Sequence, residues 1–93
     1  MTIVLMNNIC LYTTFYNEDN NYRKNELLTC LTNNISNTAI SKLIVFNEGD
    51  SIGHLAPSKI EEVLIDKRPT YQDFINYINA NSNQDDIHII ANT

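Results

Sequence analysis

The side chains best suited to bind a small polar ligand fall in four short stretches of this 93-residue chain. They supply an aromatic ring, carboxylates, cations and amides, a mixture that suits a ligand with a flat base, sugar hydroxyls and phosphates. The sequence contains neither the Gly-x-Gly-x-x-Gly turn of a dinucleotide site nor the Gly-Lys-Ser/Thr of a P-loop. The four stretches are Thr14-Phe15-Tyr16-Asn17-Glu18, Asn47-Glu48-Gly49-Asp50, Asp66-Lys67-Arg68 and Asn92-Thr93.

Each of these stretches follows a segment that is predicted to be a β-strand. Residues 9–16, 42–46 and 87–91 are apolar and rich in β-branched or aromatic side chains, which is typical of buried strands. Residues 60–66 fit either a short helix or a strand. We favour the strand, because Pro69 closes a segment that is short for a helix.

Two amphipathic helices are predicted between the strands. The first runs from about residue 22 to residue 35, where leucine and isoleucine recur at helical spacing. The second begins at Thr70-Tyr71-Gln72-Asp73, which resembles a capping box with aspartate in place of the usual glutamate. Its apolar face consists of Tyr71, Phe74, Ile75 and Ile78.

The predicted order is strand, helix, strand, strand, helix, strand. Such alternation implies right-handed crossovers and a mainly parallel four-stranded sheet. We therefore expect an α/β fold, namely a three-layer, Rossmann-like half of a doubly wound sheet, and a single domain over residues 1–93. Ligands of such sheets bind at the carboxyl ends of the strands, where all four polar stretches lie. The first eight residues are assigned no role.

Composition limits the partners of the chain. The net charge of −5 and the six basic residues argue against nucleic-acid binding, which needs clustered lysine and arginine. No apolar run is long enough to span a membrane, and the first residues lack the basic region of a signal peptide. Cys10 and Cys30 both lie among apolar residues, so we expect buried, reduced thiols and a cytoplasmic protein.

Three stretches carry a resemblance to a known family. They are TTFYNEDNNYRKNELLTCLTNNISNTAISKLIVFNEG, IDKRPTYQDFINYIN and IHIIANT. Together they resemble the N-terminal half of nucleotide-diphospho-sugar glycosyltransferases of the GT-A type, closest to a group of small bacterial and viral glycosyltransferase-like proteins. The resemblance covers about residues 8–93 and implies a truncated GT-A-like domain that binds a nucleotide-diphospho-sugar.

The same resemblance bears on catalysis. In the full-length family, the last of these strands leads into an Asp-x-Asp turn that holds Mn²⁺ or Mg²⁺ on the diphosphate. This sequence contains no Asp-x-Asp motif, and no half that would bind an acceptor follows the last predicted strand. We therefore expect binding without full transferase activity, and no catalytic residue is identified.

The resemblance also implies roles for individual residues at the strand ends. The ring of Tyr16 would lie against the base, Asn17 would bond the edge of the base, and Glu48 would bond the base or the ribose. Arg68 would meet a phosphate. The complete nucleotide-binding set is Thr14, Tyr16, Asn17, Glu48, Arg68 and Tyr71, while Asn92 and Thr93 match the approach to the metal turn.

Each of these residues also has a simpler structural interpretation. Tyr16 could be a partly buried packing residue, and Tyr71 could belong to the core-facing side of its helix. Asn17 could be a turn residue and Glu48 a solvated loop acid. Arg68 could do no more than pair with a neighbouring aspartate, a contact of roughly 0–1 kcal/mol.

Two alternatives to the transferase lineage remain open. The chain could be a non-catalytic α/β interaction or inhibitor protein of viral or mobile-element type, or it could be a fragment of a longer protein. In either case the apolar final strand, residues 87–91, leaves one edge of the sheet uncovered. We therefore expect a homodimer, or a protein partner that covers the open sheet.

Overall fold

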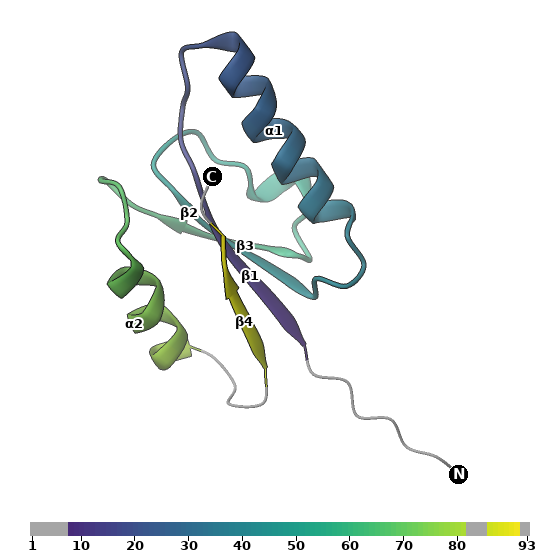
Figure 1. Cartoon of the computed structure of the whole chain (residues 1–93), viewed down its shortest axis with the longest axis vertical. Helices are drawn as coiled ribbons and strands as arrows, with labels where there is room; N and C mark the ends of the chain where they lie inside the picture. The colour runs from purple at the N-terminus through teal and green to yellow at the C-terminus, as the bar shows by residue number, and fades with distance from the viewer. Residues whose placement is uncertain (1–7, 82–85, 92–93) are drawn as a thin grey trace.

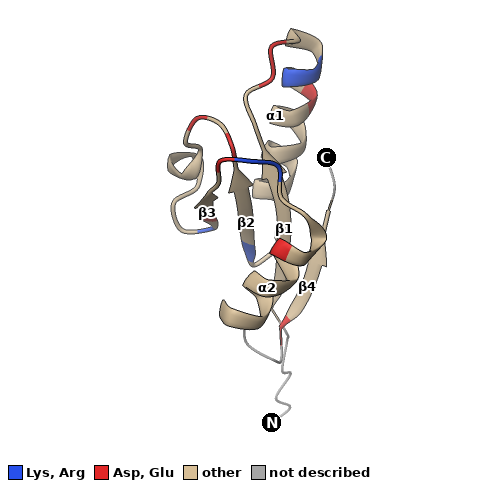
Figure 2. Cartoon of the chain, turned by 90° about the vertical axis from the view of Figure 1, so that its left-hand side faces the viewer, with Lys and Arg blue, Asp and Glu red and all other residues tan. Residues whose placement is uncertain are grey.

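The computed structural model describes residues 8–81 and 86–91 of the chain. In this part of the chain, four parallel strands form one sheet in the order β3-β2-β1-β4 (Figure 2). The prediction of an α/β fold with a parallel sheet is therefore confirmed, including the strand that we favoured before Pro69. The strands are β1 (Ile9–Phe15), β2 (Lys42–Asn47), β3 (Ile60–Leu64) and β4 (Ile87–Ile90).

Two helices connect the strands, α1 (Asn21–Ser36) and α2 (Tyr71–Asn81), and a short 3₁₀ helix, η1 (Gly53–Leu55), lies between β2 and β3. The side chain of Asn20 caps α1 by accepting a hydrogen bond from the backbone N–H of Arg23 at 3.1 Å. The predicted capping box of α2 is confirmed. Asp73 accepts from the Thr70 N–H at 2.7 Å, while the Asp73 N–H donates to the Thr70 hydroxyl at 3.3 Å.

Helix α1 packs on the face of the sheet that carries the odd-numbered residues of β1 and β2. Leu27 and Leu31, one helical turn apart, are buried against Leu11, Leu43 and Val45. Val45 and Leu43 have no exposed surface at all. This cluster is the larger of the two apolar cores and fixes α1 over the middle of the sheet (Figure 1).

Helix α2 packs on the opposite face, against the even-numbered residues. Phe74 is its buried residue, and its ring centroid lies 4.5 Å from that of Phe46 on β2. Tyr12 and Ile44 complete this second cluster together with Cys10. Because side chains alternate along a strand, the same two central strands supply both cores. The helices accordingly lie on either side of the sheet in Figure 1.

The prediction that the last strand is buried is wrong. Ile87 and Ile89 on β4 are each 45% exposed. β4 is an edge strand, and its odd-numbered residues share the face of Ile9 and Leu11, the face that α1 covers only nearer the centre of the sheet. Ile90, on the other face, does pack against the α2-side core.

The prediction of two buried thiols is confirmed for Cys10 and is wrong for Cys30. Cys10 is buried at 7% exposure, whereas Cys30 is exposed. Cys30 precedes the buried Leu31 on α1, and neighbouring helical positions point about 100° apart, so the apolar neighbours of Cys30 in sequence do not cover it. Both cysteines are free. None of the helices that the described residues form is long and apolar enough to cross a membrane.

Replacing Phe74 tests how α2 is anchored. Because Phe74 is only 3% exposed and stacks near Phe46, we expect Phe74→Ala to lower the free energy of unfolding by about 3–5 kcal/mol. Urea denaturation followed by circular dichroism measures the change. Ile75→Ala is the control, since Ile75 is 42% exposed on the same helix and its loss should cost much less. Equal losses for both variants would contradict this packing.

Candidate functional site

Two hollows open at the carboxyl end of the sheet, one on each face. The α2-side hollow has a volume of about 520 Å³ and lies between the ends of β2 and β3 and the start of α2. The α1-side hollow measures about 320 Å³ and lies between the end of β1, the start of α1 and the loop after β2. Both occupy the edge at which parallel α/β sheets bind ligands. The α2-side hollow is lined by Phe46, Leu64, Ile65, Asp66, Lys67, Pro69, Asp73 and Asn76, and the α1-side hollow by Phe15, Tyr16, Asn17, Glu18, Asp19, Lys24, Leu27, Asp50 and Ile52.

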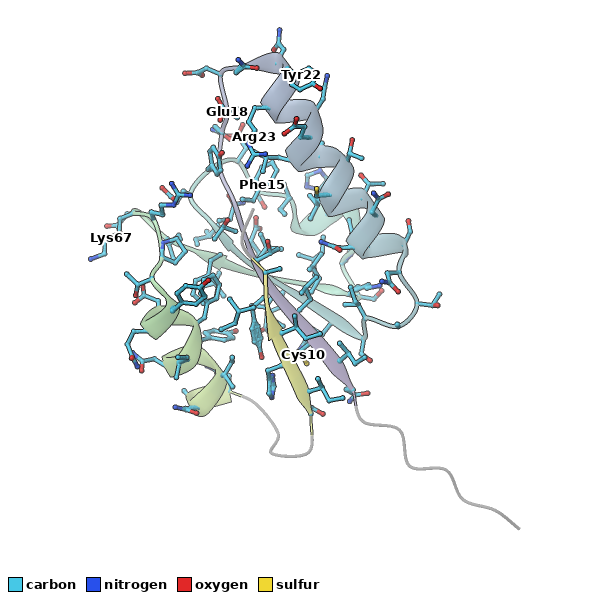
Figure 3. All side chains as sticks on the ribbon, in the orientation of Figure 1. Cys10, Phe15, Glu18, Tyr22, Arg23 and Lys67 are labelled. Carbon is cyan, nitrogen blue, oxygen red and sulfur yellow. The ribbon has the colours of Figure 1, made fainter. Side chains whose placement is uncertain are left out.

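The α2-side hollow combines an apolar floor with a polar rim. Phe46, Leu64, Ile65 and Pro69 supply the apolar surface, and Leu64 is 70% exposed there. The rim carries one cation, Lys67, two aspartates and an asparagine amide. Figure 3 shows Lys67 on the loop before α2, at the outer side of the molecule. This hollow suits a flat, partly apolar group that also carries polar or anionic substituents.

Asp73 on this rim is held in its ionised form. The backbone N–H of Thr70 lowers the pKa of the Asp73 carboxyl below its usual value of 3.8, and nearby Lys67 acts in the same direction. Asp73 therefore accepts the capping hydrogen bond of α2 with one carboxylate oxygen, and its negative charge lies at the rim of the hollow. Thr14 pairs with Phe46 in the strand register, so it lies on the same face as this hollow.

The α1-side hollow is acidic. Glu18, Asp19 and Asp50 line it together with a single cation, Lys24. Glu18 and Arg23 both lie at the start of α1 in Figure 3, and Arg23 donates to Glu26 at 2.9 Å. Three carboxylates against one ammonium disfavour an anionic ligand in this hollow.

The loop between β2 and η1 is held by a buried network around Asn47, which is 1% exposed. The Asn47 amide donates to the Asp50 carbonyl at 2.8 Å and to the Glu62 carboxylate, and its oxygen accepts from the Gly49 N–H at 2.7 Å. Glu62 also accepts from the Ile52 N–H at 2.9 Å. We call these five residues the Asn47–Glu62 network. The sequence reading had placed Asn47 in a loop and missed this role.

Glu62 is a charged member of the network. Burial by itself would raise the pKa of its carboxyl group, but hydrogen bonds from Ile52, Ser51 and Asn47 outweigh it. The pKa therefore lies below the usual 4.5. The Ser51 hydroxyl donates to Glu62 at 2.7 Å. Near neutral pH the loop is thus closed around a carboxylate.

A close contact joins this loop to the end of β1. The Asn17 side-chain oxygen accepts from the Asp50 N–H at 3.0 Å. A Cβ atom on Gly49 would lie 2.4 Å from the Asn17 side-chain oxygen and 2.7 Å from the Asn17 backbone nitrogen, closer than real Cβ contacts. Glycine is therefore needed at position 49 for space, since no described glycine has a positive φ.

The six predicted nucleotide-binding residues are divided between the two faces. Tyr16 and Asn17 line the α1-side hollow. Tyr16 also packs against the α1-side core, which confirms its packing role. Asp50, not Glu48, lines that hollow, and Glu48 is exposed. Arg68 is exposed on the segment beside the α2-side hollow, where its neighbour Lys67 forms the wall.

The core interpretation of Tyr71 is wrong, because this side chain is 59% exposed at the start of α2. Thr14 is half-buried and does not line the α2-side hollow. Asn92 and Thr93 lie outside the described residues. Within the described residues, no group of three His, Cys, Asp or Glu side chains is placed to hold a metal ion.

A third polar group lies at the opposite, amino end of the sheet, under α2. The Tyr12 hydroxyl lies 2.9 Å from Nδ1 of His88, so His88 contacts a core tyrosine. The Tyr77 hydroxyl donates to Glu61, which also accepts from Lys42 at 3.3 Å. Sequence reading missed this group because its members come from five different elements.

The chemistry of this amino-end group is structural. Burial raises the pKa of both Tyr12 and Tyr77 to about 12, so the two phenols stay neutral. Burial likewise raises the pKa of the Cys10 thiol, which disfavours the reactive thiolate. The hydrogen bond from Tyr77 lowers the pKa of Glu61 and keeps it charged beside Lys42. The group therefore ties α2 to β3 and offers no activated nucleophile.

Comparison with protein-family models, curated proteins and solved structures finds no significant match to this chain. The resemblance to GT-A glycosyltransferases therefore remains a proposal.

Gly49 provides a test of the contact with Asn17. We expect Gly49→Ala to lower the free energy of unfolding by about 1–3 kcal/mol, because the new Cβ overlaps the Asn17 side chain and backbone. Adding Asn17→Gly should restore only part of the loss, since the backbone nitrogen at 2.7 Å remains. Chemical denaturation measures both values.

The control is Gly53→Ala, where the nearest atom to a new Cβ is 3.4 Å away on the flexible side chain of Glu62. It should change stability by less than about 0.5 kcal/mol. A Gly49→Ala variant as stable as Gly53→Ala would show that the two loops do not approach as described.

Glu62 provides a pH test. Since its pKa is lowered in the folded state, its contribution to stability is present above pH 4.5, the usual value, and is lost as the pH falls below it. We expect Glu62→Gln to cost about 1–3 kcal/mol at pH 7 and the difference from wild type to shrink between pH 5 and pH 3. Glu48→Gln, at an exposed acid, is the control. If the stability difference between Glu62→Gln and wild type did not change with pH, the loop would not be held by an ionised Glu62 carboxylate.

Proposed function

We propose that the chain is a GT-A-like, three-layer α/β domain that binds a nucleotide-diphospho-sugar at the carboxyl end of its sheet. The observation that carries the proposal is the α2-side hollow, an apolar-floored space at the carboxyl edge of an all-parallel sheet, with Lys67 on its rim beside two aspartates and Arg68 next to it in sequence. Its volume of about 520 Å³ falls in the range of roughly 300–1,000 Å³ that is typical of small-molecule sites.

The two hollows differ in their suitability for the ligand. In the α2-side hollow the base would lie on the apolar floor near Phe46 and Pro69, and the diphosphate would meet Lys67 and the adjacent Arg68. The α1-side hollow, with three carboxylates and one lysine, would repel a diphosphate. Asn17 consequently acts through the loop contact at Gly49, which shapes the edge between the hollows, and Tyr16 packs against the α1-side core.

The proposal concerns binding, and transfer is not part of it. Tyr12, Tyr77 and the Cys10 thiol under α2 are kept neutral, so this group supplies no activated nucleophile. A second candidate function, a non-catalytic interaction protein, is favoured by one different observation, the exposed isoleucines of β4.

Ligand binding can be tested by thermal unfolding with uridine and guanosine diphosphates and their sugar conjugates, with and without Mn²⁺. At ten times the dissociation constant, a bound ligand adds about 1.4 kcal/mol to stability. In a domain of this size that raises Tm by roughly 5–10 °C. No shift with any of these compounds at millimolar concentration would refute the proposal.

Two lysines distinguish the hollows. We expect Lys67→Ala to weaken binding by about tenfold or more, because it removes a charge-assisted contact to phosphate. Lys24→Ala is the matched control, since Lys24 lines the acidic α1-side hollow and should leave the affinity unchanged. Isothermal titration calorimetry gives both constants. The reverse order of effects would move the site to the other face.

A further inference from the structure

β4 forms an edge of the sheet that carries no charged side chain. It pairs with β1 along one side, in a register that places Ile87 opposite Ile9 and Ile90 opposite Tyr12. The Ile87 N–H donates to the Asn8 carbonyl at 2.8 Å, so the odd-numbered residues of β4 direct their backbone groups to β1. In a parallel ladder, the even-numbered residues then direct theirs to the outer edge. Edge strands of this kind can pair with a strand from another chain.

The exposed side chains of β4 form a row on one face. Ile87 and Ile89 are each 45% exposed and point to the face of α1, on the same side as Ile9 and Leu11. Ala91, directly after β4, packs against the α1-side core on that face. The row on this face therefore consists of Ile87, Ile89 and Ala91 and is apolar, while His88 lies on the other face beside Tyr12.

The other edge of the sheet is different in kind. β3 carries two carboxylates, Glu61 and Glu62, and Glu61 pairs with Lys42 on β2 at 3.3 Å. Charges on an edge strand are a common means of preventing strand pairing. β3 has this protection and β4 lacks it, which makes β4 the edge that is suited to pairing.

We propose that a second copy of this chain pairs with β4 in an antiparallel manner, across a twofold axis that passes beside Ile89 and stands perpendicular to the sheet. In that arrangement Ile89 faces Ile89 of the partner subunit, and Ile87 faces Ala91 of the partner subunit. All of these side chains lie on one face, because strand side chains alternate with a period of two. Each exposed isoleucine thus gains an apolar neighbour, and the interface is closed and isologous.

Electrostatic repulsion does not oppose this antiparallel arrangement in spite of the net charge of −5. Asp86, directly before β4, is the described acid nearest to the edge in sequence. It lies three residues from the axis, so the two copies of Asp86 are separated by about six residues, or roughly 20 Å. That distance exceeds the Debye length of about 8 Å at physiological ionic strength, and the repulsion is largely screened.

Sedimentation velocity across protein concentrations from low micromolar to several hundred micromolar tests the dimer. The contact comes from a strand of four residues, so we expect a dissociation constant on the order of tens of micromolar. The mass should rise from 10.7 kDa towards twice that value. A monomer at all concentrations, or continued growth beyond the dimer, would overturn the proposal.

Matched isoleucine variants identify the surface. Ile89→Lys should weaken association by at least about tenfold, because it places two ammonium groups opposite each other at the axis. Ile75→Lys is the control, since Ile75 is 42% exposed on α2 and lies away from β4. Ile89→Thr keeps a β-branched side chain and should also weaken association while circular dichroism stays unchanged. Equal association of the Ile89 and Ile75 variants would exclude β4 as the interface.

Discussion

The buried amide of Asn47 is the interaction on which the carboxyl end of this sheet depends. A polar side chain that is 1% exposed is tolerated because each side of the amide has partners, in Gly49, Asp50 and Glu62. The Asn47 carbonyl also accepts the Ile65 N–H at 3.0 Å. Through these bonds one residue fixes the end of β2, the end of β3 and the loop that leads to η1. Removing any partner would leave a buried group unsatisfied.

Most of the secondary structure could be predicted because its causes are local. The i, i+4 pair Leu27 and Leu31 and the reciprocal cap of Thr70 and Asp73 are visible within one helical turn of sequence. The exposure of β4 could not be predicted from the sequence, because the composition of this strand matches that of a central, buried strand. Its exposure follows from its position at the edge, which is decided by where α2 returns the chain.

The strand pattern places the candidate site residues at one edge of the sheet, but it does not assign them to one of the two faces. The carboxyl ends of parallel strands must meet, so the strand pattern alone brings Tyr16 and Lys67 to one edge. Beyond the last strand residue, however, alternation no longer determines the direction of a side chain. Tyr16 lies in the loop before α1 and lines the α1-side hollow, whereas Lys67 lies in the loop before α2 and lines the α2-side hollow. The Asn47–Glu62 network spans fifteen residues of sequence, too far apart for a local pattern to indicate it.

The two ends of the sheet consequently have different properties. At the amino end, neutral Tyr77 and ionised Glu61 hold α2 against β3, and Phe74 anchors the same helix in the core. With α2 fixed in this way, the helix also fixes the wall of the α2-side hollow formed by Asp73 and Asn76. Under the proposed function, a ligand would need to order little of that wall, and less of the interaction energy would be lost to conformational entropy. Of the two edge strands of the sheet, β3 carries two glutamates, whereas β4 carries no acid, lysine or arginine.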